Sequence, residues 1–149
     1  MRISAGVGSL MTRLLFLING VLPVTVGGLI YLLFRGESII MFSWVDMTGL
    51  GSALTIARNW IGDYGIPNWA LYNLPAGLWA YSLSSILLVV WKSNRVGLVW
   101  VSIGVVLALG SEFGQALGFV PGTFSSGDVL AYALGFGLSH YLNFKKYWQ

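Results

Sequence analysis

The sequence has very few groups that can carry chemistry. It contains no cysteine and a single histidine, His140, among its 149 residues. Disulfides, thiolate metal sites and sites with several histidine ligands are therefore excluded. No nucleophile elbow, Walker loop or paired-histidine motif is present, so we predict no metal, no cofactor and no identifiable catalytic residue. Only 9% of the residues are charged, against about 25% in an average soluble domain.

Apolar residues, by contrast, are abundant and occur in long runs. They make up 56% of the chain, and several uncharged runs approach the length of about 20 residues that crosses a bilayer. The first run is longer than the apolar core of about 7–15 residues in a signal peptide, so we expect it to stay as an anchor. The sequence predicts an all-α integral membrane protein: one domain, a bundle of about four transmembrane helices. The expected spans are about 14–34, 71–91, 96–120 and 128–144.

The loop 35–70 between the first two spans is too apolar for a solvated linker. From Leu50 to Ile61, apolar residues recur at helical spacing, while the opposite face holds polar residues such as Arg58. This pattern predicts either an amphipathic helix lying in the membrane interface or a helix packed as a cap on the bundle.

The positions of the basic residues predict the orientation. The formal net charge of +3 is scattered beside apolar runs and not clustered, so we expect no nucleic-acid partner. On the outer side we find only Arg35 and Arg58. By the positive-inside rule both termini are then cytoplasmic. The cytoplasmic set is Arg2, Arg13, Lys92, Arg95, Lys145 and Lys146.

Small residues predict how the last two spans pack. Lipid tails compete equally for apolar side chains, so transmembrane helices approach each other through small residues. The third span carries Gly110, Gly114 and Gly118 at four-residue steps, and the fourth carries Ala131 and Gly135 in the same register. We therefore expect these two ridges to form a close antiparallel pair.

Glu112 is the most informative polar residue, because an acid inside a span costs about 2.5–3.5 kcal/mol on insertion scales. Gln115 lies on the same helix face, and Asp128 begins the returning helix. We expect the three to form an outward-opening polar cleft that Arg58, Tyr72 and Asn73 join. Structural interpretations stay open: Ser125 and Asp128 suit a helix cap and first turn, Gln115 can bridge two helices, and Glu112 can pair to hold the bundle.

The second half of the chain resembles the VanZ-like family of small bacterial membrane proteins. The residues that carry this resemblance are Leu74-Pro75, Glu112-Phe-Gly-Gln115, Pro121-Gly122, Asp128 and Gly135. The sequence departs from the family at Thr123, where an arginine is expected, and at Tyr132, where an asparagine is usual. The resemblance implies a place in the bacterial inner membrane and a role in the envelope, linked to low-level teicoplanin resistance.

These observations favour binding over catalysis. We expect the outer-leaflet cleft to bind or handle an envelope lipid or a lipid-linked glycan precursor. One alternative is a proton-coupled transporter or channel in which Glu112 titrates. Another is a structural subunit that docks a protein partner or a second copy through the glycine ridge.

Overall fold

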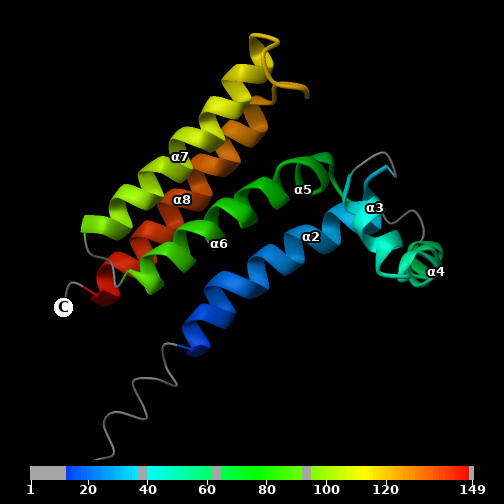
Figure 1. Cartoon of the computed structure of the whole chain (residues 1–149), viewed down its shortest axis with the longest axis horizontal. Helices are drawn as coiled ribbons and strands as arrows, with labels where there is room; N and C mark the ends of the chain where they lie inside the picture. Colours follow the sequence, from blue (N-terminus) through cyan, green and yellow to red (C-terminus); the bar gives the residue numbers. More distant parts are fainter. Residues whose placement is uncertain (1–12, 37–39, 62–64, 92–94, 148–149) are drawn as a thin grey trace, which may run out of the picture.

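The computed structural model describes residues 13–36, 40–61, 65–91 and 95–147. Within these ranges the chain is helical and contains no strand (Figure 1). A short π-helix, η1, precedes seven α-helices. The elements are η1 (Leu17–Val21), α2 (Leu22–Phe34), α3 (Ile40–Met47), α4 (Gly51–Ile61), α5 (Asn68–Tyr72), α6 (Leu74–Val90), α7 (Arg95–Ala116) and α8 (Ser126–Tyr147).

Two helical stretches are long and apolar enough to cross a membrane: Arg13–Phe34 and Arg95–Ala116, each of 22 residues. They correspond to the first and third predicted spans. Helix α6 is apolar but has only 17 residues. Helix α8 is long enough but more polar, with an acid in its first turn and two lysines near its end. The fold is therefore all-helical with two candidate membrane-spanning helices.

Helix α7 ends at Ala116, before the predicted end of the span at residue 120. Gly118 has a φ of 76°, a left-handed conformation that glycine adopts without strain. The Val120 and Phe119 N–H groups both donate to the Gly114 carbonyl, at 3.2 and 2.8 Å. This glycine-based cap closes the helix, so Gly114 and Gly118 serve its termination.

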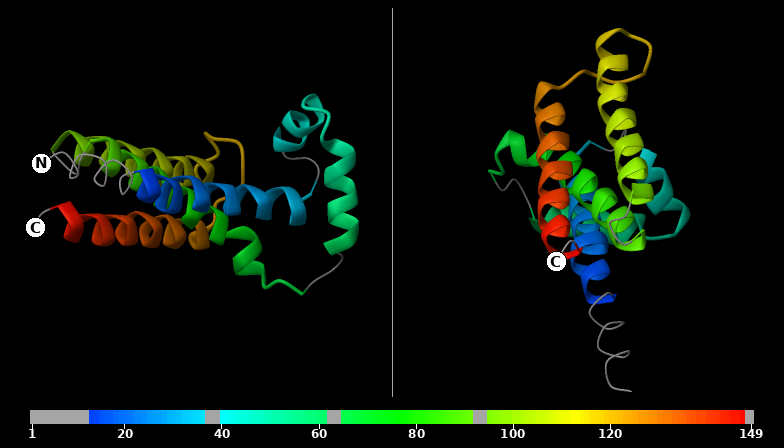
Figure 2. Two further views of the ribbon diagram at one scale, coloured as in Figure 1. Left: turned by 90° about the horizontal axis from the view of Figure 1, so that it is seen from below. Right: turned by 90° about the vertical axis from the view of Figure 1, so that its left-hand side faces the viewer.

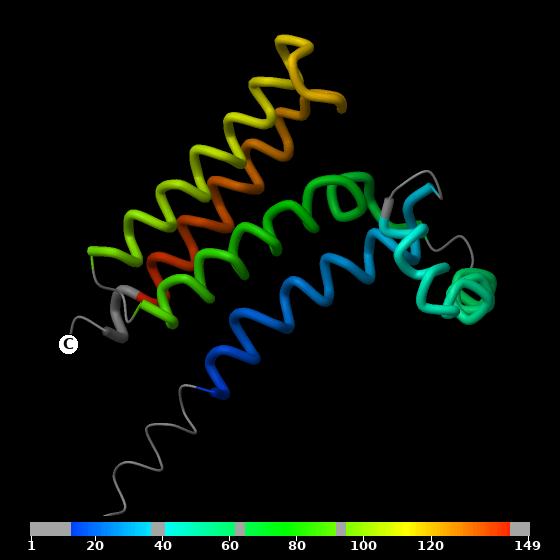
Figure 3. Tube along the Cα trace, in the orientation of Figure 1, coloured from blue at the N-terminus to red at the C-terminus, as the bar shows by residue number. Residues whose placement is uncertain are grey.

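Helix α6 lies at the centre of the bundle. It packs against η1, α2, α7 and α8, and its most extensive contact is with α8 (Figures 1 and 2). The chain trace in Figure 3 shows α5 and the beginning of α8 at one end of the bundle and the end of α8 at the other. Helix α4 crosses the direction of the long helices beyond the first of these ends (Figure 2). Many large apolar side chains on the outer surfaces of the helices are exposed.

The small residues of α8 pack on α6 and not on α7. A Cβ atom added to Gly135 would collide with the Gly77 carbonyl and lie 3.0 Å from the Ala80 Cβ. A Cβ added to Gly77 would lie 3.1 Å from the carbonyl oxygen of Ala131. The two helices therefore approach almost to backbone contact at this crossing.

The predicted pairing of a glycine ridge on α7 with α8 is wrong. A Cβ at Gly110 or Gly118 would meet no atom within 4 Å, and one at Gly114 would meet only Val120 of the turn after α7. The physical reason is that α6 has its own small-residue face, at Gly77 and Ala80. This face already packs against the small residues of α8, so the α7 glycines do not reach them.

A buried polar layer joins α6 and α8 at the other end of the bundle. Ser85 and Ser139, which are 1% and 0% exposed, share a hydrogen bond of 2.9 Å between their hydroxyl oxygens. The Asn143 side-chain amide donates to the Ser139 carbonyl at 2.8 Å. These buried polar groups satisfy one another's hydrogen-bonding needs inside the bundle.

Replacing Ser139 with Ala should cost only about 0.6 kcal/mol of unfolding free energy, the average for an interhelical hydrogen bond in a membrane bundle. Titration with SDS in mixed micelles measures this. Ser102→Ala, at an exposed site on α7, is the matched control and should change nothing. A loss several times larger than this average would mean that the layer acts cooperatively.

Helix α2 begins irregularly. The five residues of η1 form a π-turn directly before α2, and Pro23 stands in the first turn of α2. The Tyr81 hydroxyl donates to the Asn19 side-chain oxygen at 2.6 Å, and the Ser82 hydroxyl donates to the Gly20 carbonyl. Helix α6 thus holds the irregular turn with two hydrogen bonds.

Candidate functional site

Glu112 is almost fully buried, with 4% of its surface exposed. Its Oε2 atom accepts a hydrogen bond of 3.1 Å from the backbone N–H of Ser125, immediately before α8. The first N–H groups of a helix have no acceptor within the helix and carry partial positive charge. Glu112 therefore fastens the beginning of α8 to α7.

Asn73 connects the same point to the beginning of α6. Its side-chain amide donates to Asp128 Oδ1 at 2.9 Å and to the Ser125 hydroxyl at 3.3 Å. The Ser125 hydroxyl also accepts from the Asp128 N–H at 3.2 Å, so the predicted cap is confirmed. Asn73, Glu112, Ser125 and Asp128 form one connected set, which we call the polar cluster.

Two tyrosines from different helices lie near the polar cluster. Tyr31 on α2 and Tyr132 on α8 both lie within electrostatic reach of Glu112 and Asp128. The Tyr31 ring stacks on Trp79 of α6, with 4.9 Å between ring centres. The site therefore draws on α2, α6, α7 and α8. Asp128 is half-buried whereas Glu112 is closed off, so Asp128 is the more accessible carboxylate.

The other residues predicted to join the cleft make their described contacts outside the polar cluster. Gln115 packs in the turn after α7, where its Cδ would lie 2.8 Å from a Cβ added to Gly122. Arg58 donates from Nη1 to the Leu32 carbonyl at 2.6 Å and so caps the end of α2. Tyr72 packs its ring against the guanidinium of Arg35, 4.7 Å from ring centre to Cζ. The structure therefore brings together Glu112, Asp128 and Asn73 of the predicted set.

Sequence reasoning missed Tyr31, Tyr132 and Arg35, whose Cζ atom lies 4.5 Å from the centre of the Tyr31 ring. Tyrosine and arginine near the ends of spans are common anchors at the membrane interface, so their types gave no distinguishing signal. Only the mutual arrangement of the helices reveals their proximity to the polar cluster.

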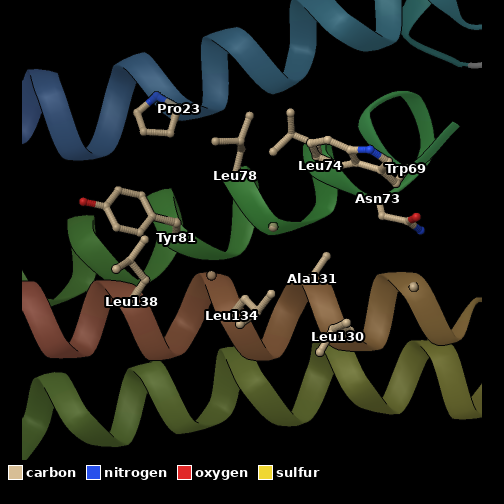
Figure 4. Close-up of a pocket in the computed structure, with 13 residues that line it drawn as sticks. Pro23, Trp69, Asn73, Leu74, Leu78, Tyr81, Leu130, Ala131, Leu134 and Leu138 are labelled. Carbon is tan, nitrogen blue, oxygen red and sulfur yellow. The ribbon is translucent and has the colours of Figure 1, made fainter. Parts of the chain in front are cut away.

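An apolar groove runs from the polar cluster along α6 and α8 (Figure 4). Its volume is about 500 Å³, within the usual range of about 300–1,000 Å³ for small-molecule sites. Asn73 lies at one end of it and Tyr81 toward the other (Figure 4). Its apolar walls include Pro23, Leu78, Leu130, Leu134 and Leu138.

No family model matches the chain, and searches of curated proteins and of solved structures gave no match. The resemblance to the VanZ-like family therefore stays a prediction. Across the described ranges there is also no group of three or more His, Cys, Asp or Glu side chains suited to hold a metal ion. The geometry of the site alone carries the argument about function.

Proposed function

We propose that this chain is a membrane protein that binds an amphiphilic envelope lipid, with the headgroup at the polar cluster and one acyl chain in the apolar groove. Asn73 is the observation that carries this proposal. Its side chain lines one end of the groove and at the same time donates to Asp128 at 2.9 Å. A polar end and an apolar body are thus joined as they are in a lipid.

The groove suits a ligand that arrives from within the bilayer. Leu134 and Leu138 line it and are 64% and 53% exposed, so it opens sideways toward lipid. Moving an acyl chain from the bilayer into the groove gains little binding free energy, because the bilayer interior and the groove are equally apolar. Selection must therefore come from the headgroup and from the shape of the groove.

The polar cluster favours headgroups that carry hydroxyl groups. An ionised carboxylate accepts hydrogen bonds but cannot donate them, and the hydroxyl groups of a sugar or of glycerol supply the donors. We assign direct contact to Asp128, the accessible acid, and a positioning role to buried Glu112, which holds the beginning of α8. The proposed mechanism is recognition of a lipid or lipid-linked glycan, with no bond broken.

The proposed membrane placement follows from charge and helix direction. We propose that α6 and α8 also span the membrane, giving four spans with both termini cytoplasmic in a bacterial inner membrane. The polar cluster then faces the outer leaflet. Helix α4, with Ile56 and Trp60 58% and 85% exposed, lies in the membrane interface as an amphipathic segment. On the VanZ-like resemblance alone, we further propose a link to low-level teicoplanin resistance.

Native mass spectrometry of protein extracted gently from its own membrane tests the proposal. The wild-type protein should retain a defined lipid or lipid-linked species. Asp128→Asn should lower that retention several-fold, because the amide is a weaker acceptor for a headgroup hydroxyl. Glu112→Gln should lower it as well, because the buried amide holds the Ser125 N–H less strongly. The folded yield of both variants should stay at the wild-type level.

Asp46→Asn is the matched control, because Asp46 is an exposed acid on α3 outside the polar cluster. It should retain the lipid fully. If the wild-type protein carries only bulk phospholipid, the binding proposal is refuted, and a stoichiometric protein partner in the same spectrum would favour the assembly role. If the folded yield of Glu112→Gln collapses, Glu112 is structural only.

A further inference from the structure

Arg35, at the end of α2, is held between two aromatic rings. Its Cζ atom lies 4.5 Å from the centre of the Tyr31 ring and 4.7 Å from that of Tyr72. In both contacts the guanidinium lies over the face of a tyrosine ring. The N–H donors of arginine lie in the guanidinium plane, so these contacts leave them free to bind another group. The Arg35 Nε atom is buried and has no hydrogen-bond partner among the described residues. A fixed cation with an unused donor is a site for an anion.

A second cation strengthens the positive potential at this point. Arg58 donates from Nη1 to the Arg35 carbonyl at 3.0 Å and packs over the Phe42 ring at 5.1 Å. Its described hydrogen bonds go to the Leu32 and Arg35 carbonyls, whose partial negative charge at the end of α2 offsets part of its positive charge. The pair of cations attracts an anion more strongly than Arg35 alone.

The Arg35 site adjoins the polar cluster. Tyr72 directly precedes Asn73, which donates to Asp128. Tyr31, the other ring on Arg35, lies within electrostatic reach of Glu112 and Asp128. Trp69 of α5 also lines the polar end of the groove. Arg35 is thus connected to the polar cluster through Tyr31 and through the Tyr72–Asn73 step, at the end of the groove that Asn73 lines.

We infer that Arg35, framed by Tyr31 and Tyr72, binds the phosphate group of the lipid. This inference rests on the proposed function and narrows its ligand to a phosphate-linked lipid with a hydroxylated headgroup. Arginine binds phosphate oxygens through two parallel N–H donors, a geometry that lysine cannot reproduce. The carboxylates accept hydrogen bonds from the headgroup hydroxyls. Arg35 pairs with the negatively charged phosphate, which the carboxylates alone would repel.

Three probes, each added to the purified full chain in neutral detergent, distinguish the contribution of the phosphate from that of the acyl chains. Dioleoyl phosphatidic acid and dioleoylglycerol share their acyl chains and differ in the phosphate. Glycerol 3-phosphate carries the phosphate without acyl chains. Native mass spectrometry measures the retention of each lipid, with and without glycerol 3-phosphate as competitor.

The wild-type protein should retain phosphatidic acid in preference to dioleoylglycerol. Arg35→Gln should lower the retention of phosphatidic acid by about fivefold, or about 1 kcal/mol, and leave dioleoylglycerol unchanged. Arg35→Lys keeps the positive charge and the folded yield but should lose part of the preference. Arg95→Gln, an exposed cation at the beginning of α7, is the control and should behave as wild type.

Equal retention of both lipids by the wild type, unchanged in Arg35→Gln, would overturn the phosphate site and leave lipid binding intact. Retention of neither lipid would overturn the proposed function itself. Full displacement by glycerol 3-phosphate at equal concentration would keep the phosphate at Arg35 but overturn a lipid as its source.

Discussion

Replacing Leu134 with Trp is expected to displace the bound acyl chain from the apolar groove while the fold stays intact. Leu134 lines the middle of the groove and 64% of its surface is exposed, so the larger indole has room only in the groove or in the surrounding lipid. Retention of the lipid identified in the wild-type protein should fall at least about tenfold, equivalent to about 1.4 kcal/mol of binding free energy. Native mass spectrometry of the intact chain measures it.

Leu107→Trp is the matched control for this variant. Leu107 lies on α7, is 67% exposed and does not line the apolar groove. The same substitution there should leave lipid retention unchanged. If both tryptophan variants keep the lipid, the acyl chain does not occupy the groove, and the binding site must be sought elsewhere on the bundle.

The neighbouring residue should give the opposite result. Gly135→Ala adds one methyl group where the Gly77 carbonyl and the Ala80 Cβ of α6 already make contact. Overpacking of this kind costs about 1–3 kcal/mol, and we expect the upper end because the obstacle is backbone, which cannot rotate away. The unfolding free energy from SDS titration should fall by about 3 kcal/mol, with a matching loss of folded yield.

Gly137→Ala carries the same change two positions along α8. A Cβ at Gly137 would meet no atom within 4 Å, so this variant should be neutral or gain up to about 1 kcal/mol from its better helix propensity. Equal stability of the two variants would contradict the close approach of α6 and α8 at Gly135.

Sequence reasoning went furthest where one residue type has few physical options. An acid in an apolar run must find donors, and Glu112 finds one at the Ser125 N–H. Asp128 lies in the first turn of the returning helix, as its spacing predicted. Because a short turn joins α7 to α8, the two carboxylates had to meet at the same end of the bundle. Asn73, chosen for its place at the beginning of α6, joins them through Asp128.

The sequence could not decide which small faces meet. Gly77 and Ala80 on α6 compete with the glycines of α7 for the same surface of α8, and all of these patterns have helical spacing. Choosing between them needs the crossing geometry of three helices at once. Arg58 illustrates a second kind of failure, because its partner is a pair of backbone carbonyls at the end of α2, which no side-chain pattern reveals.

The irregular beginning of α2 bears on which part of a lipid the protein can distinguish. Pro23 has no N–H to offer the Asn19 carbonyl, and the π-turn before it already departs from α-helical geometry. Helices bend most easily at such points, and Pro23 also lines the groove. The groove wall at Pro23 therefore follows a stretch where the regular helical hydrogen bonds are interrupted and α6 supplies two hydrogen bonds to the turn, whereas the polar cluster is a connected set of hydrogen bonds among groups of α6, α7 and α8. We expect broad tolerance of tail length and unsaturation, combined with strict discrimination of the headgroup.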